Sequence, residues 1–189
     1  MNFLLVDSCQ NELFVLLYNN GKVSYRTSNG NKKHNSVLLP TIDELLNESR
    51  IKISEVQNIA CVIGPGSFTG IRLGVTTCNG LAFATGCNRI AVNTFETVAY
   101  NNTNDILIAL DCRHGNYYAG QYKCGREVTL FNTTEQEMLE CGCKVIKWNG
   151  EREINKIVAC VLDKINNMEF CQMLSTLYLK KSQAERETE

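Results

Sequence analysis

The sequence predicts an α/β fold in which helices pack on mixed sheets, and three observations lead to that prediction. Short apolar runs of strand length recur along the chain, segments with apolar residues at helical spacing alternate with them, and turn signals separate the two. The 189 residues are 44% hydrophobic and 21% charged, as is ordinary for a globular protein. This length suits one large domain or two small ones.

Three antiparallel strands are predicted to open the chain. Residues 3–6 and 12–18 are apolar runs of strand length. Asn19-Asn20-Gly21-Lys22 is a strong turn signal, and the chain returns from it as a third strand at 23–26. The three strands are therefore expected to form a meander.

Helices then alternate with strands. A helix is predicted over 36–48, with Pro40 in its first turn and Ser54 capping a short helical turn beyond it. Asn93 and Glu96 match a capping box, so a further helix is expected near Phe95. The remaining elements are a strand at 59–63, a helix at about 70–85 and a strand at 89–92. This half reads β-β-β-α-β-α-β-α, which favours a mixed sheet with packed helices.

The second half repeats this order in reduced form, and an aspartate ends the first strand of each half, Asp7 in one and Asp111 in the other. The analogous architecture is the duplicated actin-like, ribonuclease-H-like (ASKHA-type) fold. In that fold, acidic residues at the ends of these strands face a nucleotide and its metal. We expect an N-terminal ribonuclease-H-like lobe over 1–100 and a reduced C-terminal lobe over 101–189. The expected elements are strands at 105–111, 117–123, 127–131 and 145–146, and helices at 134–140 and 153–168.

Charge and cysteine content limit the function classes. A net charge of −1 argues against a broad basic surface that grips nucleic acid alone. The ten cysteines include no Cys-x-x-Cys pair, and Cys141-Gly142-Cys143 is weak evidence for zinc, so reduced thiols are expected. No stretch of 18 apolar residues predicts a membrane span, and the N-terminus does not read as a signal peptide. A cytoplasmic location is expected.

The most distinctive motif is the glycine loop, Gly64-Pro65-Gly66-Ser67-Phe68-Thr69-Gly70, which joins a predicted strand to a predicted helix. It matches neither a Walker A loop nor a dinucleotide fingerprint. Two interpretations stay open: amides at a helix N-terminus that hold an anion or a partner's loop, or a structural turn that seats the helix close to the sheet. The possible anion or nucleotide contacts are Asp7, Ser8, Gly64, Gly66, Ser67 and Thr69, although Asp7 is more simply explained as a turn cap.

The helix after the loop carries small residues on one side, and together with the helix at 36–48 it favours an intermolecular docking surface over internal packing alone. No catalytic residue and no metal site are predicted, because His34 and His114 lie in different segments. The turn from Asp111 to Asn116 is interpreted as a hairpin held by an Asp–Arg pair, with ligand contact as the alternative. The expected interface residues are Leu38, Leu39, Ile42, Leu45, Leu46, Gly70, Leu73, Gly74, Thr77 and Leu81.

Three motifs together resemble the TsaB (YeaZ) family, the small subunit of the bacterial machinery that makes threonylcarbamoyladenosine at position 37 of certain tRNAs. They are the stretch from Gly64 to Arg72, His34-Asn35-Ser36 followed by Leu39-Pro40-x-Ile42, and the Asp111-x-Arg113-x-Gly115 turn. The resemblance covers roughly residues 1–122. Beyond it, Leu177-Tyr178-Leu179-Lys180 is similar to the family's C-terminal Pro-x-Tyr-Leu-Arg but lacks its proline.

The resemblance implies a non-catalytic scaffold or activator that docks onto a TsaD-type catalytic subunit through the helices at 36–48 and 70–85. It also implies homodimers through the same surface, contact with a TsaE-type ATPase, tRNA reached only through the complex, and no membrane association. No cofactor is expected in the chain alone, while ATP or ADP with magnesium is possible at the interface of the complex. The alternative function is a weak ATPase or glycoprotease-like hydrolase that uses Asp7, Ser8 and the glycine loop.

Overall fold

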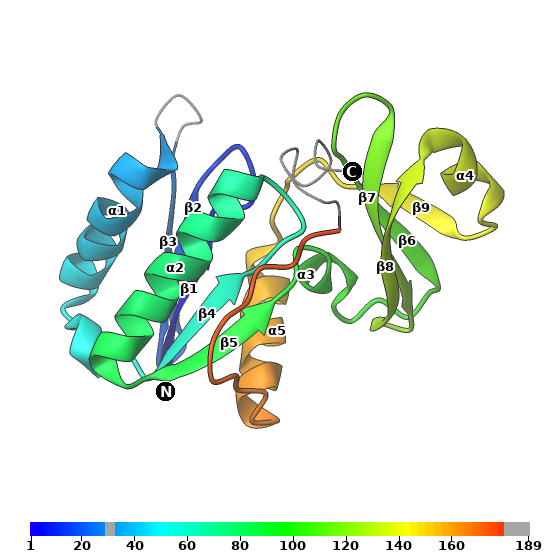
Figure 1. Ribbon diagram of the computed structural model, residues 1–189. Helices are drawn as coiled ribbons and strands as arrows, with labels where there is room; N and C mark the ends of the chain where they lie inside the picture. Colours follow the sequence, from blue (N-terminus) through cyan, green and yellow to red (C-terminus); the bar gives the residue numbers. More distant parts are fainter. Residues whose placement is uncertain (29–32, 180–189) are drawn as a thin grey trace. The chain divides into compact units, whose positions relative to one another are not determined.

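The computed structural model describes residues 1–28 and 33–179, which fold as two compact units (Figure 1). The first unit comprises Met1–Val92 and Val161–Leu177, and the second comprises Asn93–Cys160 with the described residues after Leu177. The expected division at residue 100 differs from this one in two respects. The second unit begins at Asn93, and a late stretch of the chain returns to the first unit.

The first unit is built on a five-stranded sheet with the order β3-β2-β1-β4-β5. The strands β1 (Asn2–Asp7), β2 (Phe14–Asn19) and β3 (Lys22–Thr27) form the predicted antiparallel meander. Asn20 and Gly21 take positive φ angles of 47° and 90°, as a tight turn between such strands requires. The strands β4 (Asn58–Val62) and β5 (Asn88–Val92) then add in parallel beside β1.

Two helices, α1 (His34–Ser49) and α2 (Phe68–Thr85), cover one face of this sheet (Figure 1). The prediction for Pro40 was wrong: because α1 begins at His34, this proline lies inside the helix and not in its first turn. Ser54 is not a cap either, since it lies within the 3₁₀ turn η1 (Ile53–Glu55), which begins after Lys52. The buried core between helices and sheet includes Leu4, Val6, Val15, Leu17, Ile59, Ile71 and Cys78.

The second unit repeats the plan of the first, which confirms the duplicated fold. Its four strands have the order β8-β7-β6-β9, with β6–β7 and β7–β8 antiparallel and β6–β9 parallel. This is the arrangement of β3-β2-β1-β4 in the first unit, including a helix before the fourth strand. The elements are β6 (Ile106–Asp111), β7 (Asn116–Lys123), β8 (Arg126–Thr134), α4 (Glu135–Glu140) and β9 (Lys144–Lys147). Helix α5 (Ile154–Asn166) follows them, and its residues from Val161 onward belong to the first unit.

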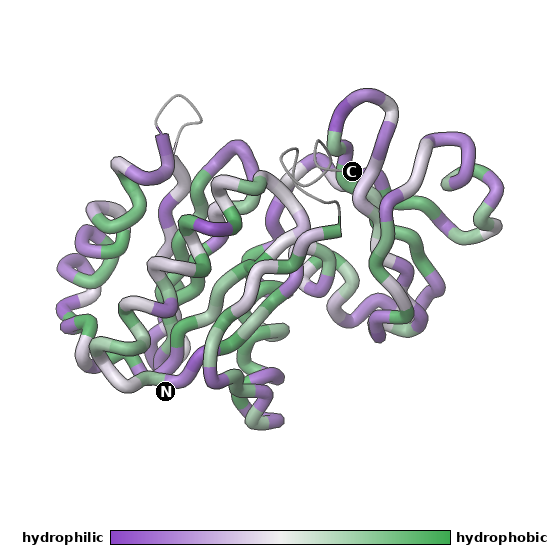
Figure 2. Tube along the Cα trace, viewed as in Figure 1, coloured by the Kyte–Doolittle hydropathy of each residue, from purple (hydrophilic) through white to green (hydrophobic). Residues whose placement is uncertain are grey.

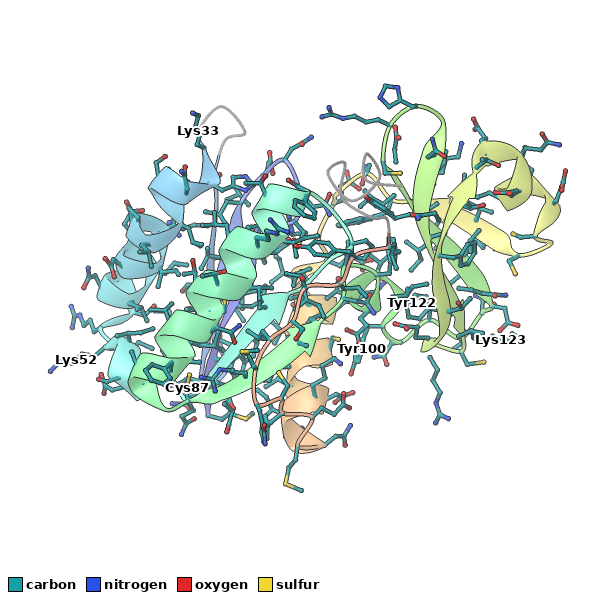
Figure 3. The ribbon with its side chains drawn as sticks, viewed as in Figure 1. Lys33, Lys52, Cys87, Tyr100, Tyr122 and Lys123 are labelled. Carbon is teal, nitrogen blue, oxygen red and sulfur yellow. The ribbon has the colours of Figure 1, made fainter. Side chains whose placement is uncertain are left out.

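The chain enters the second unit through a capped helix, α3 (Glu96–Ala99). Asn93 Oδ1 accepts hydrogen bonds from the amides of Phe95 and Glu96 at 2.8 and 2.9 Å, and Glu96 Oε2 accepts one from the amide of Asn93 at 2.6 Å. This reciprocal pattern is the predicted capping box, and it is confirmed. The buried Tyr122, labelled in Figure 3, donates its hydroxyl to Asn93 Oδ1 at 3.1 Å, and Asn93 Nδ2 donates to Glu127 at 2.7 Å.

The segment from Cys171 to Leu177 ties the end of the first unit to its sheet and to α2. Asn79 on α2 donates to the Leu174 carbonyl at 2.9 Å and accepts from the Leu174 amide at 3.0 Å. The amide of Cys171 donates to the backbone carbonyl of Arg89, and the amide of Leu177 donates to the backbone carbonyl of Ile63. Leu174 is consequently buried in the core. Lys180, the last residue of the C-terminal motif, lies outside the described residues.

All ten cysteines are free thiols, as predicted. The side-chain hydrogen bond with Cys78, together with burial, raises the pKa of Cys61, so that this thiol stays protonated and unreactive. Within the described part of the chain, no helix combines the length and apolar character that crossing a bilayer requires.

Candidate functional site

The corner after β1 holds Asp7 and Ser8 in structural hydrogen bonds. Asp7 Oδ1 accepts the amide hydrogen of Cys9 at 2.9 Å, which is the turn-capping role favoured by the sequence. Ser8 is fully buried, and its hydroxyl donates to the carbonyl of Gly70 at 2.7 Å. Asp7 therefore caps the turn after β1, and Ser8 joins that corner to the start of α2.

The glycine loop brings α2 unusually close to this corner. A Cβ atom added at Gly66, Gly70 or Gly74 would lie closer than 3.0 Å to atoms of Ser8 or Cys9. Ser67 caps the helix by accepting the amide hydrogen of Gly70 at 3.3 Å. These contacts account for the three glycines through packing alone and favour the structural interpretation of the loop. Of the possible anion contacts, Ser67 and Thr69 are exposed, and Gly66 is half-buried.

Six of the ten residues expected at an interface are buried within the first unit itself: Leu38, Ile42, Leu45, Leu46, Gly70 and Gly74. The reason is that the apolar stripe of α1 covers its own sheet, and the glycines of α2 let that helix approach the β1 corner. These six residues are covered by their own unit, and a partner cannot contact them while this core stays packed.

The other four residues remain near the surface. Leu39 of α1 is 53% exposed, and Leu73, Thr77 and Leu81 of α2 are half-buried. The sequence reasoning missed Phe83, whose side chain is 87% exposed at the end of α2. The signal was available, because the exposed residues of α2 recur at steps of three and four. We call this stripe the exposed face of α2; it consists of Thr69, Arg72, Thr76, Gly80 and Phe83.

The exposed face of α2 carries little charge for a solvent-facing helix. Arg72 is the only charged residue in the 18 residues of α2, and its guanidinium stacks 3.9 Å from the centre of the Phe68 ring. Figure 2 shows the contrast: α2 is mostly white and green, whereas α1 alternates green with purple. A weakly polar helix with an exposed phenylalanine is the kind of surface that a partner protein covers.

The two histidines occupy separate places, as the sequence predicted. The ring Nε2 of His34 lies 3.1 Å from the Asn11 carbonyl, and His114 lies in the β6–β7 turn with a positive φ of 57°. Asp111 does hold that turn, but its partner is the amide of Arg113 at 2.7 Å and not the guanidinium. Among residues 1–28 and 33–179, no three His, Cys, Asp or Glu side chains gather as a metal site would require.

Two β-β-β-α-β halves, with the first and fourth strands parallel in each, define the class of duplicated actin-like, ribonuclease-H-like proteins. Two solved structures agree with this class. YeaZ from Pseudomonas aeruginosa superposes with a TM-score of 0.77 over 94% of this chain and 99% of that one, at 20% identity. A Pseudomonas aeruginosa protein described as similar to peptidase YEAZ superposes with a TM-score of 0.78 over 95% of this chain and 99% of that one, also at 20% identity.

Sequence comparison gives the family. A family profile described as TsaD, tRNA N6-adenosine threonylcarbamoyltransferase, matches residues 27–182. The tRNA threonylcarbamoyladenosine biosynthesis protein TsaB of Escherichia coli is 30% identical over 65% of this chain and 55% of that protein, and the Bacillus subtilis TsaB is 34% identical over 66% and 57%. The chain belongs to this TsaD-type family and, within it, to the TsaB (YeaZ) group. It spans little more than half the length of these two curated relatives.

Proposed function

We propose that this chain is a non-catalytic subunit in the synthesis of tRNA N6-threonylcarbamoyladenosine, and that it docks onto a TsaD-type catalytic subunit. Membership of the TsaB group supports the pathway, because the curated relatives are named for that biosynthesis. The exposed face of α2 is the proposed contact, joined by Leu39 on the neighbouring helix α1.

The observation that carries the proposal is Phe83. A phenylalanine that is 87% exposed in the free chain gains about 2 to 3 kcal/mol if a partner buries it fully. Its neighbours on the stripe, Thr76 and Gly80, are small and uncharged, so covering them requires no desolvation of a charge. An aromatic anchor surrounded by small residues is the typical centre of a protein interface.

The corner at Asp7 and Ser8 supports a role without catalysis. A hydrolase of this architecture would need those side chains free to reach a substrate. Here the Ser8 hydroxyl is buried and donates to Gly70, and the Asp7 carboxylate accepts from Cys9. Turnover of magnesium-ATP by the purified chain alone would contradict this part of the proposal.

The other expected partners follow from the same family and are proposed with it. A TsaE-type ATPase joins the complex, and tRNA is reached through the catalytic subunit. In the absence of that subunit, two copies of this chain associate through the same exposed face of α2. Because the homodimer and the heterodimer then compete for one surface, adding the catalytic subunit dissociates the homodimer.

The test is co-purification with the TsaD-type subunit of the same cell. Phe83→Glu is expected to weaken binding on the order of 100-fold, because a charge replaces the buried ring. Leu39→Glu is expected to have a smaller effect in the same direction. The matched control is Leu139→Glu, which places the same charge on another highly exposed apolar position, in α4, where the side chain is 78% exposed.

All three variants should keep the thermal transition of the native chain, because the altered side chains lie on the surface. Native affinity for the Phe83→Glu variant would overturn the docking surface. Gly74 is not a suitable test position, because a side chain there collides with Ser8 and disturbs the fold itself.

A further inference from the structure

A pocket of about 300 Å³ lies within the second unit. Val98 of α3, Ile146 of β9 and Trp148 give it apolar walls. Asn102, Arg152 and Lys156 are among its polar lining residues. Its volume is at the lower end of the range for small-molecule sites, which suits a ligand of nucleoside monophosphate size or smaller.

The pocket is lined by the loop that corresponds, in the duplicated fold, to the glycine loop of the first unit. In the first unit, β4 runs parallel to β1 and leads through that loop into α2. In the second unit, β9 runs parallel to β6 and leads through residues 148–153 into α5. The carboxyl ends of parallel strands are the usual ligand positions in open α/β sheets.

The loop that forms one wall of the pocket is fixed by its own hydrogen bonds. The Trp148 amide donates to the Ala109 carbonyl at 2.8 Å, and the indole Nε1 donates to the Glu151 carbonyl at 2.7 Å. Asn149 Oδ1 accepts from the Glu151 amide at 3.0 Å. Because the indole N–H is already bonded to Glu151, Trp148 offers the pocket an aromatic surface and not a donor.

Two cations of the pocket lining, Arg152 and Lys156, are the candidate partners of an anion. The third, Lys147, pairs with Glu135 outside the pocket, and the lining carboxylates are those of Glu151 and Glu153. Lys156 pairs with Glu153 at 2.7 Å, and the Glu153 side chain is 67% exposed. An ion pair this exposed to water contributes little to stability. An anionic ligand can therefore replace the Glu153 carboxylate as the partner of Lys156.

We propose that this pocket binds a small aromatic phosphate, with its ring against Trp148 and its phosphate beside Arg152 and Lys156. Guanidinium and ammonium groups together suit a doubly charged phosphate, and an indole face stacks on planar rings. The site is independent of the proposed docking surface, because every residue that lines it belongs to the second unit.

The chain offers a direct measurement, because Trp148 is its only tryptophan. Titration of the purified full-length chain with adenosine monophosphate should change tryptophan fluorescence in a saturable way, with half-saturation below about 1 mM. Adenosine, which lacks the phosphate, and ribose 5-phosphate, which lacks the ring, should each bind at least about tenfold more weakly. Calorimetry on the same samples gives an independent reading of the binding.

Replacing both cations, by Arg152→Gln with Lys156→Gln, should abolish the response. Lys123→Gln is the matched control, since Lys123 is an exposed lysine of the same unit outside the pocket (Figure 3). The proposal is overturned if neither fluorescence nor calorimetry detects saturable binding, if the double variant binds as the native chain does, or if adenosine binds as tightly as its monophosphate.

Discussion

The contact between Gly74 and Ser8 predicts a substitution whose effect changes sign with its background. Gly74→Ala adds a methyl group where the Ser8 hydroxyl lies, closer than 3.0 Å to it. The hydroxyl must then turn away from the Gly70 carbonyl, which removes a buried hydrogen bond of 2.7 Å. Overpacking and the lost bond together cost about 3 kcal/mol, while alanine in place of glycine gains about 1 kcal/mol of helix propensity. The net expected destabilisation is about 2 kcal/mol.

In a Ser8→Ala background the methyl group added by Gly74→Ala no longer contacts a hydroxyl oxygen. The next atom, Cys61 Sγ, lies 3.6 Å from the added methyl group, which is ordinary van der Waals contact. Gly74→Ala is then expected to stabilise by up to about 1 kcal/mol, so that the coupling between the two positions is about 3 kcal/mol.

The assay is urea unfolding of the four proteins of this cycle, followed by far-ultraviolet circular dichroism. That signal includes α1 and α2 of the first unit, whereas tryptophan fluorescence arises from Trp148 in the second. Destabilisation of the same size in both backgrounds would refute the reasoning, because it would show that the cost of the methyl group does not come from Ser8.

Further predictions concern the other buried polar contacts. Asn93→Ala removes the α3 cap and the partner of Tyr122, and should destabilise the second unit by about 3 kcal/mol in urea unfolding followed by Trp148 fluorescence. Burial raises the pKa of Tyr122 above its ordinary value, so the stability it contributes is present below about pH 10 and is lost as the pH rises beyond it. Tyr122→Phe should therefore flatten the alkaline fall of the thermal midpoint; an unchanged fall would show that other groups cause it. Asn79→Ala removes both bonds to Leu174 and should speed amide exchange across residues 171–177, measured by mass spectrometry, whereas unchanged exchange would mean that other contacts hold the segment.

The local pattern of the sequence was sufficient for most of the fold. Strands and helices alternate with a period that the apolar residues reveal, and the capping box at Asn93 fixes the start of α3 by short-range chemistry alone. The start of α1 was misplaced because His34 and Asn35 carry no apolar signal, and this error put Pro40 in the wrong turn.

The candidate site was harder to predict, because an apolar stripe does not reveal what covers it. Leu38 and Ile42 fit a docking surface or a core equally well in the sequence, and only the sheet beneath them decides for the core. The same holds for Gly74, whose neighbour Ser8 is distant in sequence. Phe83 could have been predicted as exposed by assigning the buried stripe of α2 first and then examining the opposite side of the helix.

The return of residues 161–177 to the first unit has a consequence for how the protein is made. A ribosome releases Asn93–Cys160, the main stretch of the second unit, before it releases Leu174, which follows its partner Asn79 by 95 residues. Most of the first unit is therefore translated early, but one flank of α2 stays uncovered until nearly all of the described chain has been translated. Synthesis halted before Leu174 would leave that flank open to chaperones and proteases.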